Sequence, residues 1–274
     1  MTELLRVDLR RILKDKLLLV VIILTVVFAL STPLLYALIF SSGEFANDPM
    51  LANLISAKAL FFSNFSLGNN LGLLAPVLLA IVLCKDFSFG TVRNKIIVGK
   101  SRSAMFLSMF ISCAVVLTGV ILLGAFLSLL TSLCFFDYQA TPFTAADFGY
   151  FVVSLVFDVL VLIFASALLS CLCACAKNVG IAIVLYVGFT LLLVMIGSIL
   201  QVVIMVLEAY PEYKTLLKIL QVAERLNVGM AVNYIGAGTS YTVEDVLYLT
   251  LPPLVGTAGF LSLGLYSFNR KNLK

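Results

Sequence analysis

The sequence predicts an all-α membrane protein with six transmembrane helices. Of its 274 residues, 62% are hydrophobic and only 12% are charged, and the mean hydropathy is +1.14, far outside the range of soluble globular proteins. The apolar residues lie in stretches of about 20 or more, the length an α-helix needs to cross a hydrocarbon core of about 30 Å. Only a helix pairs all backbone polar groups within such a stretch, and the short alternating segments of a membrane β-barrel are absent from the sequence.

Six apolar stretches are predicted to span the membrane. They cover residues 17–40, 65–84, 104–136, 148–176, 179–207 and 246–268. Pro76 is expected to kink the second span, and the third is long enough to tilt or protrude. Thr242 precedes the sixth span, where its side chain can accept a hydrogen bond from the amide of Asp245 and begin the helix. We interpret residues 1–274 as a single transmembrane domain.

The distribution of basic residues predicts the orientation. Fourteen of the 18 lysines and arginines lie in the amino-terminal arm, in the loop between the second and third spans, at Lys177 and in the tail. The opposite side carries the other four together with nine acidic residues. Basic residues are retained on the cytoplasmic side, so both termini are expected in the cytoplasm, in agreement with an even number of spans.

An amphipathic helix is predicted before the first span. Over residues 3–16, leucines and isoleucine recur on one side and basic residues on another, which is typical of a helix lying along the membrane interface. The apolar side comprises Leu5, Leu9 and Ile12, and the basic side comprises Arg6, Arg10 and Lys14. The alternative is that this segment serves only as a topology signal.

A second amphipathic helix is predicted in the outer segment, residues 208–245. Its apolar residues are Tyr213, Leu216, Leu217, Leu220 and Ala223, and Pro211 can occupy the first turn. This outer helix, residues 211–226, either gates the exit of a pathway or seals the outer surface.

Motifs for catalysis and metal binding are missing from the sequence. The chain has no histidine, which excludes the usual serine triad and zinc-protease patterns. Cys171, Cys173 and Cys175 alternate, and on a helix only the outer two share a face, so we interpret them as packing residues. Residues 94–101 end in the Gly-Lys-Ser of a phosphate-binding loop, but Asn94 stands where its first glycine belongs. We therefore expect no catalytic residue, metal or cofactor in this chain.

The loop between the second and third spans carries a pattern of its own. It reads Asp86-x-x-x-Gly90-Thr91-x-Arg93-Asn94 and then Gly99-x-Ser101-Arg102. This resembles the cytoplasmic loop of bacterial ABC-2 type permeases, the membrane subunits of ATP-binding-cassette exporters, in which a glutamate usually stands at the position of Asp86. The tail at residues 268–274 is similar to the family's ending, although Asn272 replaces the usual aspartate.

The resemblance implies the membrane half of a type V-like exporter in a bacterial plasma membrane. Loop 85–103 would then contain a coupling helix seated in a groove of a cytoplasmic ATPase, which binds the ATP and magnesium. The partners would be two ATPase subunits, a second copy of the chain or a related permease, and membrane lipid, but no nucleic acid. The substrate would be an amphipathic molecule, either a peptide such as an antimicrobial peptide or lantibiotic, or a lipid. The coupling residues would be Asp86, Phe87, Phe89, Gly90, Thr91, Arg93, Asn94 and Lys95; the alternative is a solvated loop whose cations only fix topology.

Asp158 is the one ionisable Asp, Glu, Lys or Arg within the predicted spans. Facing lipid would cost about 3 kcal/mol, so its side chain is expected to face the protein interior, as part of a substrate pathway or as a polar packing contact. The rival function class is an ATP-independent secondary transporter or channel. That class predicts inverted repeats and a polar relay through the spans, neither of which is evident.

Overall fold

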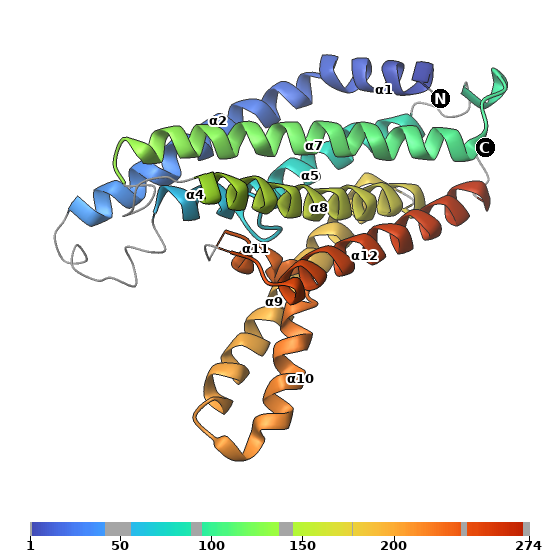
Figure 1. Cartoon of the computed structure of the whole chain (residues 1–274). Coiled ribbons are helices and arrows are strands. Elements are labelled where there is room, and N and C mark those ends of the chain that lie inside the picture. The colour runs from blue at the N-terminus through green and yellow to red at the C-terminus, as the bar shows by residue number, and fades with distance from the viewer. Residues whose placement is uncertain are drawn as a thin grey trace.

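The computed structural model describes residues 2–41, 56–88, 95–136, 145–176, 178–236 and 240–270, and within these ranges all regular structure is helical. The first half of the chain forms α1 (Thr2–Lys14), α2 (Lys16–Ser41), α4 (Ala57–Ser63), α5 (Asn70–Ser88) and α7 (Arg102–Leu133). The second half forms α8 (Ala145–Cys175), α9 (Val179–Leu207), η1 (Pro211–Tyr213), α10 (Lys214–Arg225), η2 (Val228–Met230), α11 (Ala231–Tyr234) and α12 (Val243–Arg270). The start of α1 and the end of α12 lie at the same end of the bundle (Figure 1).

Among the described residues, five helices are long and apolar enough to cross a membrane: α2, α7, α8, α9 and α12. They coincide with the first, third, fourth, fifth and sixth predicted spans, and the bounds of α9 are those predicted. At the start of α12, the amide of Asp245 donates to Thr242 Oγ1 at 3.2 Å and the amide of Thr242 donates to Asp245 Oδ2 at 3.0 Å. This reciprocal cap confirms the predicted beginning of the last helix.

The second predicted span differs from the expectation of six equivalent helices. Residues 65–84 do not form one helix: the chain turns after α4, and the apolar part of α5 covers only Asn70–Lys85. The Asn69 side chain donates to the Ser63 carbonyl at 3.0 Å across this turn. A Cβ on Gly72 would lie 1.9 Å from the Ser66 carbonyl oxygen, so only glycine permits the turn to approach α5. Side-chain and backbone bonds in this turn shorten the helix, and the part of the chain that the structure describes has five full-length spans, not six.

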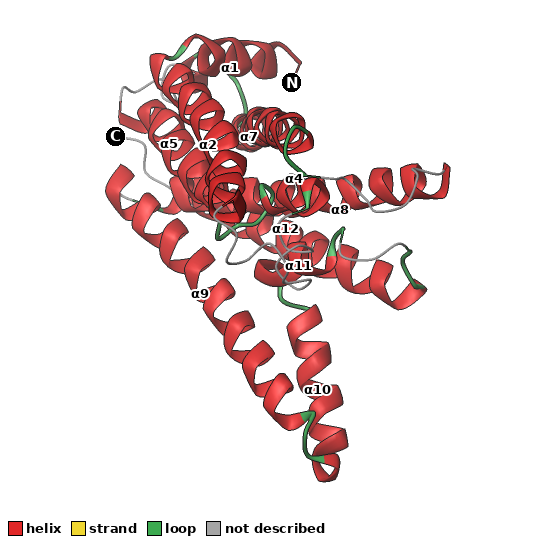
Figure 2. Ribbon diagram, turned by 90° about the vertical axis from the view of Figure 1, so that its left-hand side faces the viewer, coloured by secondary structure: helices red, strands yellow, loops and turns green. Residues whose placement is uncertain are grey.

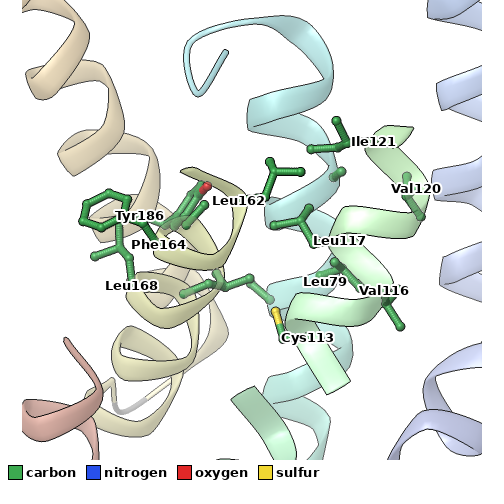
Figure 3. Packing of buried hydrophobic residues seen from close by; sticks show 14 of the residues in the cluster. Leu79, Cys113, Val116, Leu117, Val120, Ile121, Leu162, Phe164, Leu168 and Tyr186 are labelled. Atoms are coloured by element: carbon green, nitrogen blue, oxygen red, sulfur yellow. The ribbon is translucent and has the colours of Figure 1, made fainter. Parts of the chain in front are cut away.

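The bundle is packed around α7 and α8. Figure 3 shows Leu117 and Ile121 on the side of α7 toward α5 and α8, and Val116 and Val120 on its opposite side. The fully buried Tyr186 of α9 lies beyond α8. The face of α12 against α8 is flat at Gly256, where a Cβ would come within 2.4 Å of the Phe164 ring. Lipid is as apolar as these side chains, so close packing rather than burial from water holds the helices together.

The hairpin of α9 and α10 projects away from the rest of the bundle, as both views show (Figure 1, Figure 2). Near its base, the Asn227 side chain donates to the Leu193 carbonyl at 2.8 Å, which fixes η2 against the middle of α9. A helix is confirmed where the outer amphipathic helix was predicted, as η1 and α10 with Pro211 in the first turn, and its side of the membrane stays a prediction. Its apolar face is only partly covered, and Glu224 is the one residue of α10 that is buried.

Candidate functional site

The candidate site is the loop that joins the end of α5 to the start of α7. Among its predicted coupling residues, Phe89, Gly90, Thr91, Arg93 and Asn94 lie outside the described residues. Asp86 and Phe87 belong to the last turns of α5, but their side chains are also outside what the structure describes. Lys95 is therefore the predicted coupling residue whose side chain the structure places.

Lys95 lies against the amino-terminal helix. Its Nζ is 2.6 Å from Asp8 Oδ1 on α1, and the other carboxylate oxygen of Asp8 accepts a hydrogen bond of 2.6 Å from Ser108 on α7. Asp8 is only 3% exposed. Because its charge is both paired and hydrogen-bonded, its burial is tolerated.

This contact changes the predicted faces of α1. The sequence pattern placed Leu5, Leu9 and Ile12 on the apolar side, whereas the residues buried on α1 are Leu4, Asp8 and Ile12. The ion pair draws Asp8 into the interface and turns the helix so that Leu5 and Leu9 are only half-buried. Arg6, Arg10 and Lys14 face outward as predicted.

The other end of the loop is held in the same way. Lys85, in the last turn of α5, donates to Asp15 Oδ2 at 2.7 Å, while the amide of Leu17 donates to Asp15 Oδ1 at 3.0 Å. Burial alone would raise the pKa of Asp15, but the hydrogen bonds from Lys85 and Leu17 and the nearby positive charges hold it below its usual value. The α1–α2 junction is thereby tied to the end of α5.

A third ion pair is weaker. Lys100 Nζ lies 3.7 Å from Glu3, whose side chain is 87% exposed, so solvent screens the attraction. Together the three acidic residues of the segment before α2 pair with three of the five cations of loop 85–103. We call these three pairs, Asp15 with Lys85, Asp8 with Lys95 and Glu3 with Lys100, the amino-terminal clamp.

Between the clamped positions, the loop presents an apolar surface to solvent. Residues 95–97 are helical, and Ile96 packs against the core. Ile97 and Val98 are 73% and 74% exposed, and the turn that follows uses Gly99 with φ +81°. Phe87 and Phe89 were the apolar residues predicted for coupling, and Ile97 and Val98 were not among the predicted residues. The sequence contains a signal for this pair: three β-branched residues, 96–98, stand between Lys95 and Lys100 and directly before Gly99.

The loop also contacts the last helix. Arg102 Nη1 donates to the Asn269 carbonyl oxygen at 2.7 Å, near the end of α12. Ser101 caps the start of α7 by accepting from the amide of Ala104 at 3.4 Å. A displacement of the loop would therefore reach α1, α7 and α12 together.

Asp158 lies apart from the loop, near the middle of α8, and is fully buried as predicted. Among the described residues, neither carboxyl oxygen has a hydrogen-bond partner. The four helices that pack against α8 carry charged residues only in their first or last turns, and α9 carries none. An unpaired carboxylate in such a place costs several kcal/mol, which favours the uncharged acid.

The six cysteines are free thiols. Cys171 and Cys173 are buried and Cys175 is exposed, and no group of metal-ligating side chains occurs among the described residues.

A comparison with models of known protein families found no match, and a comparison with curated proteins found none either. The chain is a helical, multi-pass membrane protein by the length and composition of its helices.

Proposed function

We propose that this chain is the permease subunit of an ABC-2 type exporter, driven by ATP hydrolysis in separate partner subunits. The observation that carries the proposal is the loop between α5 and α7, which the amino-terminal clamp fixes on both sides and which exposes the apolar pair of Ile97 and Val98. An exposed apolar pair flanked by lysines that are anchored to α1 is suited to insert into a groove of another protein.

The clamp would carry movement from that groove into the membrane helices. A force on the helical turn at residues 95–97 acts through Lys95 on Asp8, and through Asp8 on Ser108 of α7. At the other end it acts through Lys85 on Asp15, at the start of α2. Helices α2 and α7, which pack against each other, would then move as one unit with α1.

The substrate of such an exporter would be amphipathic. The outward faces of α9 and α12 are almost entirely apolar, and few of their residues are buried within one chain. A second copy of the chain or a related permease would supply the other wall of a pathway between the two membrane subunits. Such a wall suits a peptide or lipid-like molecule better than a sugar or ion.

Association with an ATPase tests this proposal. The tagged chain is purified in nanodiscs from its native host, together with an Ile97→Asp variant and a matched Val243→Asp control, which changes an equally exposed residue at the start of α12. We expect the wild type and the control to retain an ATPase subunit and the Ile97 variant to lose it. Gly90→Pro and Arg93→Glu should abolish substrate-stimulated ATP hydrolysis while leaving membrane insertion intact. Absence of any ATPase from the wild-type preparation would count against the proposal.

A second candidate is an ATP-independent secondary transporter, and the buried carboxyl of Asp158, which has no hydrogen-bond partner within the described ranges, favours it. A carboxyl that is uncharged when buried and ionises when exposed can couple a proton to a conformational change. Purified chain alone in proteoliposomes distinguishes the two candidates. Uptake driven by a proton gradient without ATP, and lost in Asp158→Asn, would establish the second and exclude the first.

A further inference from the structure

A cavity of about 160 Å³ lies at the end of the bundle where α8 and α12 begin. Its walls come from the beginnings of these two helices, residues 240–241 before α12, the end of α10, and α11. Four of the ten tyrosines of the chain line it, which makes the wall aromatic rather than aliphatic: Tyr150, Tyr234, Tyr241 and Tyr248. The loop and clamp described above have no part in this site.

The cavity holds one positive and one negative side chain. Arg225 Nη1 lies 3.2 Å from Asp245 Oδ1, and its guanidinium carbon lies 5.8 Å and 5.9 Å from the ring centres of Tyr234 and Tyr248. The other carboxylate oxygen of Asp245 accepts from Thr242. Both charged groups are about one-third exposed, so a ligand in the cavity can reach them.

The aromatic wall is already held in place without a ligand. The rings of Tyr150 and Tyr241 stack with centres 4.5 Å apart. The Tyr241 hydroxyl lies 2.6 Å from Ser154 Oγ and accepts from the Gly236 amide at 3.2 Å. Burial raises the pKa of Tyr241, and burial together with Glu224 raises that of Tyr234, so both hydroxyls stay protonated at neutral pH. A wall fixed in advance loses little conformational freedom on binding.

The position of the cavity on α12 indicates what kind of ligand it can bind. Asp245 lies in the first turn of the helix, at the boundary where its apolar run begins, and Leu249 forms the apolar part of the wall. Three and seven residues beyond Tyr248, Leu251 and Val255 are exposed on the same side of α12 and continue an apolar face along the helix. A molecule with its polar end in the cavity would therefore lay an apolar tail along this face.

We propose that this cavity binds the zwitterionic headgroup of a phospholipid, with the phosphate at Arg225 and the ammonium over the tyrosine rings beside Asp245. Arginine forms charge-assisted hydrogen bonds with phosphate, and electron-rich rings attract ammonium groups. An anionic headgroup would pair with Arg225 but would bring no positive group to Asp245, so its negative charge and that of Asp245 would repel each other. This inference does not depend on how the protein uses energy.

Lipid binding by the detergent-solubilised chain tests the inference. Phosphatidylethanolamine and phosphatidylglycerol with identical acyl chains are titrated, and retained lipid is measured by native mass spectrometry. Arg225→Gln should weaken phosphatidylethanolamine binding about tenfold, the effect of losing a charge-assisted hydrogen bond. Tyr248→Leu, which keeps the ion pair, should also weaken it severalfold. The matched control is Tyr213→Leu, which changes an exposed tyrosine at the tip of the α9–α10 hairpin and should leave binding unchanged.

The inference is supported when the zwitterionic lipid is preferred and both cavity variants lose that preference while remaining monodisperse and helical. Equal retention of the two lipids would overturn it, as would binding that neither cavity variant alters. Free phosphoethanolamine is added as a competitor to separate a lipid from a soluble headgroup. Competition at the same concentration as the lipid would overturn the assignment to a membrane lipid, because the tail would then contribute nothing.

Discussion

Lys95 Nζ lies 2.6 Å from Asp8 Oδ1, although 87 positions of sequence separate the two residues. Their side chains are largely buried, with 16% and 4% exposed, so the pair is shielded from solvent. It joins the amino-terminal helix to the loop that carries the family-like pattern. The pair therefore makes α1 part of the proposed coupling structure instead of a helix that only lies at the interface.

The first prediction concerns this pair. Asp8→Ala should lower the free energy of unfolding by about 3 kcal/mol, because it removes the charge opposite a largely buried lysine and the acceptor of Ser108. Unfolding in mixed micelles measures the change. Glu3→Ala is the control: its pair with Lys100 is exposed, and its loss should cost less than about 0.5 kcal/mol. If Asp8→Ala lowered the free energy of unfolding no more than Glu3→Ala does, the pair of Asp8 and Lys95 would add no stability beyond that of an exposed ion pair.

The second prediction is a pH dependence at Asp15. Its pKa is lower in the folded state than the usual 3.8, so the stabilisation by its charge is complete above that value and is lost as the pH falls through the folded-state pKa. The stability difference between wild type and Asp15→Asn should be constant near neutral pH and shrink below about pH 4. The asparagine oxygen can still accept from the Leu17 amide, so the variant isolates the charge. A difference that persists unchanged into acid would contradict the role of the Lys85 pair.

The third prediction is that Asp158 is protonated at neutral pH. An infrared spectrum of the chain in nanodiscs should contain the carbonyl stretch of a protonated carboxyl, and Asp158→Asn should remove it. The Asp245→Asn control should leave this band unchanged, because the Asp245 carboxylate accepts from Thr242 and pairs with Arg225 at 3.2 Å. Asp158→Asn should change stability by less than about 1 kcal/mol, since neither Asp158 oxygen has a hydrogen-bond partner to lose in the part of the chain that the structure describes. A band unaffected by Asp158→Asn would mean that this carboxyl is ionised.

The fourth prediction concerns orientation and uses two natural thiols. Cys134 follows the end of α7, Cys175 ends α8, and both are exposed. If the termini are cytoplasmic, a membrane-impermeant maleimide should label Cys134 in intact cells and should reach Cys175 only after the membrane is permeabilised. Cys134→Ser identifies the labelled position by removing the signal. Labelling of Cys175 in intact cells would reverse the orientation that the basic residues predict.

The positions of α2, α7, α8, α9 and α12 followed from the sequence because apolar length alone decides which segments can cross a membrane. The cap at Thr242 followed because it depends only on residues within one helical turn. The burial of Asp158 followed because a carboxyl side chain that faces lipid is costly. The break between α4 and α5 did not, since it depends on side-chain bonds by Asn64 and Asn69 to nearby carbonyls inside an otherwise apolar stretch. The exposed pair at Ile97 and Val98 was also missed, because hydropathy does not distinguish a packed residue from one that faces water.

The sequence by itself determined the class of this protein, most of its long helices and the loop that carries its most specific pattern. Composition and length act through the free energy of transfer to lipid, which needs no knowledge of neighbours. Only the tertiary structure decided that Asp8, Asp15 and Glu3 clamp that loop, and that four tyrosines, Arg225 and Asp245 enclose one cavity. These contacts join segments distant in sequence, and their energies depend on distances and burial that exist only once the helices have packed.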